Sequence, residues 1–62
     1  MRVRNQYGEV FEVSVGDYVG WKGVREDSGK ITNIKLGRFG VDFVVDTESG
    51  TQVIPANRCW PE

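Results

Sequence analysis

Hydrophobic and polar residues alternate along most of this chain, and glycines or short polar clusters interrupt the alternation about every seven to twelve residues. Residues 41–46 have the clearest alternation, with Val41, Phe43 and Val45 on one face and Asp42, Val44 and Asp46 on the other. A period of two residues is typical of a strand that buries one face and exposes the other. Apolar residues at helical spacing do not persist for three turns in any window, so the pattern predicts an all-β fold.

Strands are predicted between these interruptions. They cover residues 2–5, 9–15, 18–22, 29–36, 41–46, 51–54 and 59–60, with turns at 6–8, 16–17, 23–28, 37–40 and 47–50. In the second segment Phe11, Val13 and Val15 share one apolar face. In the fourth, Ile31 and Ile34 have an odd spacing and would face opposite ways in a regular strand, so a bulge or sharp bend between them is predicted.

Near the C-terminus the sequence predicts the end of one strand and the start of another. Pro55 has no amide hydrogen to donate, so the ladder of the strand at 51–54 should stop there. Residues 55–58 suit one turn of 3-10 helix before a final edge strand at 59–60. The apolar faces place Phe11, Trp21 and Phe43 in the core, whereas Tyr7 lies in a turn and is harder to bury.

The length of 62 residues allows one domain, residues 1–62, and a small core that needs every large apolar side chain. Apolar residues make up 39% of the chain, which is too many for a disordered tail. No apolar run approaches the ~18–20 residues of a membrane span. The first residues do not resemble a signal peptide, so a cytoplasmic protein without membrane contact is expected.

The side chains that most often perform chemistry are scarce. Histidine is absent, and Cys59 is the only cysteine, which excludes an internal disulfide and predicts a half-buried packing role. The carboxylates are spread over turns and exposed positions and do not form a pattern typical of acid–base catalysis or of a cation loop. We therefore predict no enzyme activity, no catalytic residue, no cofactor and no metal site.

Two segments of the chain are similar to known family motifs. Residues 53–57, VIPAN, resemble the apolar-Pro-Ser-Asn end motif of Src-homology-3-like (SH3-like) barrels. Residues 15–19, VGDYV, followed by 29–31, GKI, resemble the core of KOW and Tudor-type members of that superfold. The resemblance implies an all-β, five-stranded bent barrel with a 3-10 turn before the last strand. The superfold hosts many unrelated activities, so the resemblance does not define a function.

The specialised binding sites of that superfold do not carry over. The chain lacks the paired tyrosines and tandem tryptophans of barrels that bind polyproline. An aromatic cage of the Tudor type would need Trp21 and Phe43, which are assigned to the core. A weaker resemblance links Gln52, Val53 and Ile54 to the pore stretch of type II dihydrofolate reductases, which are tetrameric barrels of similar length.

The candidate binding residues are surplus rings and the cations near them, namely Phe39, Arg38, Tyr18, Trp60, Lys35 and Lys30. Exposed rings on so small a chain favour contact with a protein partner or self-association into a homo-oligomer. A nucleic-acid-binding module of KOW or Tudor type is the alternative, because cations beside rings also suit bases and phosphates. The near balance of 8 basic and 9 acidic residues restricts such binding to a local patch.

Four further cations are candidates for that local patch. Arg2 and Arg4 would converge with Lys22 and Arg25 if the first strand pairs with the strand at 18–22. The alternative is a solvated face of charges that keeps edge strands from pairing with other molecules.

Overall fold

The computed structural model describes residues 1–38 and 40–62 of the chain. Its elements in order are β1 (Arg2–Arg4), β2 (Val10–Glu12), β3 (Tyr18–Lys22), β4 (Glu26–Gly37), β5 (Gly40–Thr47), β6 (Gly50–Pro55), the 3-10 turn η1 (Ala56–Arg58) and β7 (Cys59–Pro61). The predicted all-β fold is confirmed, and the 3-10 turn directly precedes the last strand as expected.

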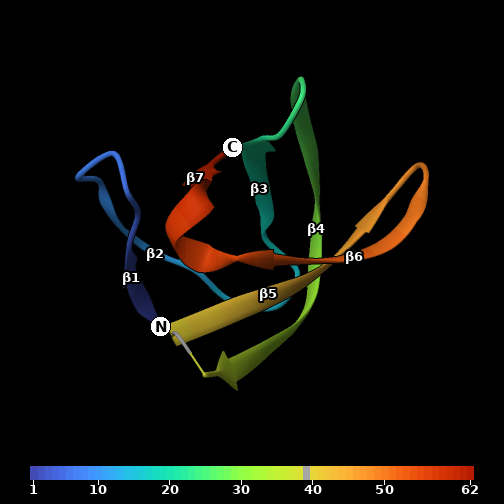
Figure 1. The fold of residues 1–62 in the computed structure, drawn as a ribbon. Helices are drawn as coiled ribbons and strands as arrows, with labels where there is room; N and C mark the ends of the chain where they lie inside the picture. Colours follow the sequence, from blue (N-terminus) through green and yellow to red (C-terminus); the bar gives the residue numbers. More distant parts are fainter. Residues whose placement is uncertain (39) are drawn as a thin grey trace.

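The strands form one large sheet and one small one (Figure 1). The large sheet is antiparallel with the order β6-β5-β4-β3-β7, and β1 pairs with β2 in a separate hairpin. The edge strands of the large sheet are β6 and β7. Within the described residues no ladder joins these two edges, so the hydrogen bonding of the sheet is open and does not close into a barrel.

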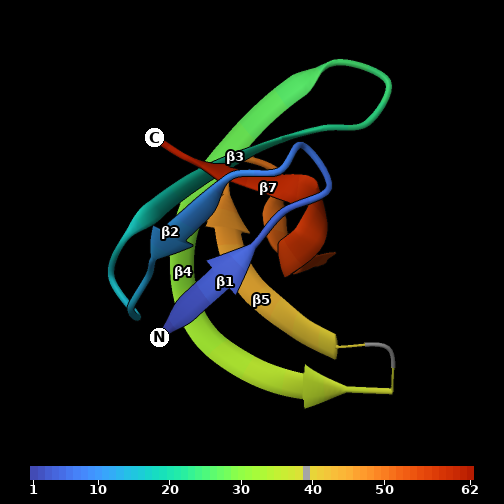
Figure 2. The same cartoon turned by 90° about the vertical axis from the view of Figure 1, so that its left-hand side faces the viewer.

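Strand β4 holds the large sheet together because both halves of it are paired. Its first half pairs with β3 and its second half with β5, and Figure 2 shows the strand curving through a long arc between them. The register shifts between Ile31 and Asn33, which leaves Thr32 as an extra residue. This bulge is the one predicted from the odd spacing, and it allows Ile31 to be fully buried while Ile34 packs against the same core.

The core lies between the concave face of the large sheet and the β1–β2 hairpin. Its buried members are Val3, Val13, Val19, Trp21, Ile31, Phe43, Val45, Ile54, Ala56 and Cys59. Trp21 and Phe43 are core residues as predicted, whereas Phe11 is half-buried at the margin. Burying a side chain of the size of Phe43 stabilises the fold by about 1.5–3 kcal/mol, so each large member matters in a chain this short.

Two strand boundaries differ from the sequence prediction by three residues, and the other boundaries differ by at most one. β2 ends at Glu12, and Val15 is 59% exposed in a turn with Gly16 instead of sharing the apolar face of Val13. The cause is local, because the Asp17 carboxylate accepts a hydrogen bond from the Ser14 amide at 2.9 Å and turns the chain. β4 begins at Glu26, since Glu26 pairs with Lys22 and extends the hairpin into the predicted loop.

Candidate functional site

Trp60 of β7 covers part of the outer face of the neighbouring strand β3. Val19 and Trp21 point inward, so Gly20 lies on the outer face, where its register partner is Trp60. A β-carbon placed on Gly20 would collide with the indole nitrogen of Trp60 and lie 2.9 Å from its Cε2. The indole therefore lies directly over the glycine, and the absence of a side chain at Gly20 makes that position possible.

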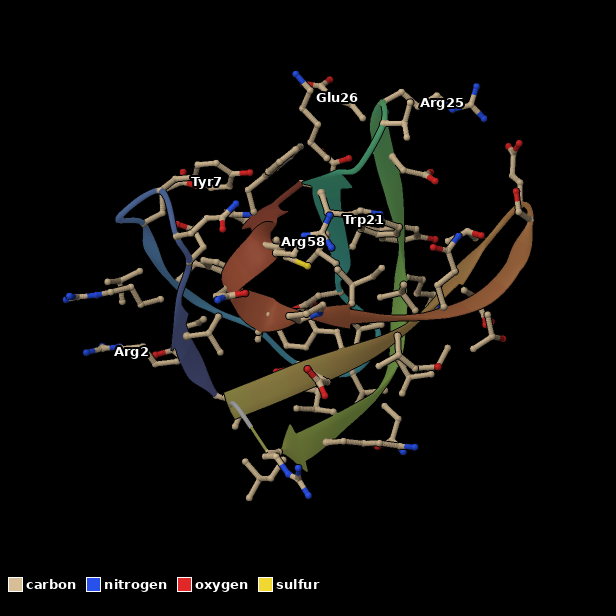
Figure 3. All side chains as sticks on the ribbon, in the orientation of Figure 1. Arg2, Tyr7, Trp21, Arg25, Glu26 and Arg58 are labelled. Carbon is tan, nitrogen blue, oxygen red and sulfur yellow. The ribbon has the colours of Figure 1, made fainter. Side chains whose placement is uncertain are left out.

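Tyr7 lies against the same tryptophan. The centroids of the Tyr7 and Trp60 rings are 5.9 Å apart and the ring planes cross at 62°, an edge-to-face arrangement that aromatic pairs favour. Tyr7 is 52% exposed, and Figure 3 shows it above the turn that follows β1. The pair thus presents aromatic surface to solvent at the junction between the small hairpin and β7.

Asn5 fixes the turn that places Tyr7. Its side-chain oxygen accepts hydrogen bonds from the amides of Tyr7 at 3.0 Å and Glu9 at 2.9 Å. Its amide nitrogen donates to the carbonyl oxygen of Cys59 and to the Glu9 carboxylate, both at 2.8 Å. Asn5 is 4% exposed, so a buried polar side chain with its partners in place links the hairpin to β7.

Carboxylates surround the tryptophan. One hollow of about 390 Å³ is lined by Tyr7, Glu9, Lys22, Glu26, Trp60 and Pro61. A second hollow on the indole is lined by Glu26, Asp27, Ser28, Trp60 and Glu62. Acidic side chains outnumber basic ones in the combined lining, so the ring is in an environment that favours a cation.

The sequence-predicted binding residues divide between different surfaces. Tyr18 is 60% exposed on the outer face of β3, two residues from Gly20, with Lys30 as its register partner. Tyr18, Lys30 and Trp60 therefore share one face of the sheet. We call the surface formed by Tyr7, Tyr18 and Trp60 the aromatic face. Tyr7 was recognised from the sequence only as a ring that is hard to bury.

The other predicted residues lie elsewhere. Lys35 is near the far end of β4, opposite Asp42, and Arg38 follows that strand in the β4–β5 turn. Phe39 lies outside the described residues. Asn5 was missed, because its only signal in the sequence is that it precedes a turn containing glycine.

The proposed convergence of Arg2 and Arg4 with Lys22 and Arg25 is wrong. It required β1 to pair with β3, but β1 pairs with β2. Figure 3 shows Arg2 and Arg25 at opposite ends of the molecule. Arg2, Arg4 and Arg38 instead line a different hollow, of about 570 Å³.

The stretch that resembles the reductase pore alternates between two faces of β6. Ile54 is buried in the core, whereas Val53 is 57% exposed on the opposite side. Gln52 is half-buried and donates a hydrogen bond to the Thr47 hydroxyl at 3.4 Å.

Cys59 belongs to the core and is fully buried, where half-burial was predicted. Its sulfur lies 3.6 Å from the Pro55 carbonyl oxygen, which accepts its hydrogen bond. Burial raises the pKa of the thiol from 9.0 to about 11, and the positive charge of Arg58 opposes this only partly. The neutral thiol is therefore a packing group.

This pKa predicts a loss of stability in alkali. Below pH 9 the thiol is protonated in both states, whereas between pH 9 and 11 it ionises only in the unfolded chain. The contribution of the neutral buried thiol to the free energy of unfolding is thus full below pH 9 and is lost as the pH rises toward 11. Urea denaturation from about pH 8 to about pH 10.5 should show the wild-type free energy of unfolding falling by about 2 kcal/mol more than that of Cys59→Ala. Equal slopes for the two proteins would contradict the prediction.

Comparisons with known proteins do not define the class of this chain. No protein-family model matches it, and no curated protein or solved structure does so. Within residues 1–38 and 40–62, no group of three or more histidine, cysteine or carboxylate side chains is arranged to hold a metal ion. The same residues contain no helix with the length and hydrophobicity needed to cross a bilayer.

Proposed function

We propose that this chain is an SH3-like module that binds a segment of a protein partner and catalyses no reaction. The strand order β7-β3-β4-β5-β6 supports the fold assignment, because it places the last strand beside the first strand of the large sheet. The 3-10 turn η1 before β7 supports it as well. The β1–β2 hairpin is then an addition that precedes the five-stranded unit.

The position of Trp60 over Gly20 carries the functional proposal. A tryptophan packed on a glycine is held in place by the backbone beneath it, so little side-chain freedom remains to be lost when a partner binds. Tryptophan and tyrosine also dominate the energetics of protein interfaces. Tyr7 meets Trp60 edge-to-face, and the exposed Tyr18 lies on the same face of β3 as Gly20, so both rings add to the aromatic area of this face.

The charges around the indole define the chemistry of the segment. Glu26 lines both hollows that flank Trp60, and Glu9, Asp27 and Glu62 add three more carboxylates. A lysine or arginine of the partner would be attracted both by the face of the ring and by these carboxylates. Phosphate groups would be repelled there, so a basic protein segment suits this surface better than a nucleic acid.

Peptide binding tests this proposal. Fluorescein-labelled peptides of equal length would carry Arg, Lys, Gln or Glu at their central positions, and binding would be followed by fluorescence anisotropy. The Arg and Lys peptides should bind tightest, and Trp60→Ala should weaken them by about tenfold, a loss of about 1.4 kcal/mol. The affinities of the Gln and Glu peptides should be the same for Trp60→Ala as for the wild type.

Val53→Ala is the matched control, because Val53 is an exposed apolar residue on the separate strand β6. If the two variants weaken the basic peptides equally, the aromatic face is not the binding site. Sedimentation of the free protein tests self-association: a dimer that dissociates in Trp60→Ala would mean that the face pairs with a second copy and would overturn the proposal.

A further inference from the structure

Strand β1 has one paired edge and one open edge. Met1 and Val13 exchange two backbone hydrogen bonds, at 3.0 and 2.8 Å. The backbone N–H of Asn5 donates to the backbone carbonyl of Glu9 at 2.9 Å. In an antiparallel ladder, successive residues alternate between facing the partner strand and facing away from it. Arg2 and Arg4 therefore direct their backbone N–H and C=O groups away from β2.

These backbone groups face a hollow instead of another strand. The hollow has a volume of about 570 Å³ and is lined by Arg2, Val3, Arg4, Arg38, Gly40, Val41, Asp42, Pro55, Ala56 and Asn57. Its walls are β1, the start of β5 and the segment around η1. Within the described residues, β1 pairs only with β2, so Arg2 and Arg4 have no ladder partner on the edge that faces the hollow. This open stretch ends at Gln6, whose backbone amide donates to the Asn57 carbonyl at 2.6 Å.

The charge of the hollow is strongly one-sided although the chain has a net charge of −1. Among the described residues, its lining includes the arginines Arg2, Arg4 and Arg38 and one acidic residue, Asp42. The Arg2 side chain extends toward β2, where its Nε lies 3.4 Å from the Glu12 carboxylate, so it must turn toward the hollow to meet a ligand there. Arg2 and Arg4 are two residues apart in the strand, so their side chains leave the same face about 6.6 Å from each other. Alternate side chains of an extended peptide have the same spacing.

We propose that the open edge of β1 binds an extended acidic segment of another protein by strand addition. The segment would exchange main-chain hydrogen bonds with Arg2 and Arg4, and its alternate carboxylates would meet their guanidinium groups. The site is separate from the aromatic face and takes a partner of the opposite charge. Because β1 has three residues, a short segment of about three to five residues is sufficient.

Two other occupants fit the edge less well. In a second copy of this chain, antiparallel pairing of the two β1 strands would place Arg2 opposite the arginine at position 4 of the other copy, and like charges directly opposite are destabilising. A nucleic acid would accept hydrogen bonds from the two N–H groups. It would leave the two carbonyl oxygens facing its own phosphates.

The test uses a fluorescein-labelled Glu-Val-Glu-Val-Glu peptide, a version with Gln for Glu, and versions N-methylated at every second residue in both frames. The unmodified acidic peptide should bind and slow amide hydrogen exchange at Arg2 and Arg4. Binding should be lost with the Gln version and with at least one methylated frame. The double variant Arg2→Gln/Arg4→Gln should weaken it by tenfold or more.

Two further variants separate this site from a general effect of charge. Lys30→Gln/Lys35→Gln removes the same charge from β4 and should leave binding unchanged. Glu12→Gln should tighten it two- to threefold, because the Glu12 carboxylate lies 3.4 Å from the Arg2 guanidinium and competes for it. Trp60→Ala should have no effect, so failure of this site is distinguishable from failure of the aromatic face.

Several results would overturn the proposal. They are the absence of binding, equal weakening in the two double variants, and binding that survives N-methylation in both frames. Oligothymidylate binding tighter than that of the peptide and lost in Arg2→Gln/Arg4→Gln would assign the site to nucleic acid. A dimer in sedimentation that protects the Arg2 and Arg4 amides would assign it to a second copy.

Discussion

Replacing Asn5 by alanine is expected to lower the free energy of unfolding by about 3–4 kcal/mol, since each buried polar group left without a partner costs about 1–3 kcal/mol. The substitution removes the acceptor of the Tyr7 and Glu9 amides and the donor to the Cys59 carbonyl. Cys59 is fully buried, so water cannot easily replace the lost bond at that carbonyl. In a domain of this size the loss is a large fraction of the total stability.

Guanidinium denaturation followed by circular dichroism measures this change. Asn57→Ala is the matched control, because Asn57 is exposed and its variant should stay within about 0.5 kcal/mol of the wild type. The Tyr7 ring resonances should also lose their contact with Trp60 in Asn5→Ala, since the turn that places Tyr7 is released. A variant as stable as Asn57→Ala would show that Asn5 does not link the hairpin to β7.

Replacing Gly20 by valine is expected to displace the Trp60 indole and to lower the free energy of unfolding by about 1–3 kcal/mol, the usual cost of overpacking. The first side-chain carbon would occupy the space of the indole nitrogen. Valine has a higher intrinsic strand propensity than glycine, so propensity alone would raise the stability of the variant. The expected destabilisation therefore comes from the collision with the indole. Basic peptides should bind about as weakly to this variant as to Trp60→Ala.

A double-mutant cycle identifies the cause of that loss. In a Trp60→Ala background the indole is absent, so Gly20→Val should cost nothing or stabilise the sheet. Gly23→Val is the control for valine itself, because a β-carbon at Gly23 has no atom within 4 Å. If Gly20→Val costs as much without the indole as with it, the collision is not the reason.

The strands with strong alternation were predictable from the sequence. Residues 41–46 lie within β5, and the odd spacing of Ile31 and Ile34 predicted a bulge or bend between them, which the structure has as a bulge at Thr32. Both features depend on local side-chain period, which the sequence displays directly. The end of β2 was not predictable in the same way, because the Ser14–Asp17 turn overrides the apolar pattern that continues to Val15.

The candidate site depends on pairing between distant segments. Tyr18 and Trp60 were recognised as surplus rings, but their common face follows from the register of Gly20 with Trp60, which are far apart in the sequence. The separate pairing of β1 with β2 likewise decides which arginines meet. Local patterns do not specify register between strands that no short turn connects, so the register of β3 with β7 required the structure. A short turn does connect β1 to β2, so their pairing was within reach of the sequence.

Strand β7 leaves Trp60 half-buried on its outer side and buries Cys59 fully on the other. A thiol reagent can reach that sulfur only after the strand has detached from the molecule, because the side chain has no exposed surface. The rate at which a thiol reagent labels the native cysteine therefore measures how often this strand opens. The same strand carries Trp60, the ring proposed to hold a partner. The labelling rate of Cys59 therefore also measures how often Trp60 leaves its position over Gly20.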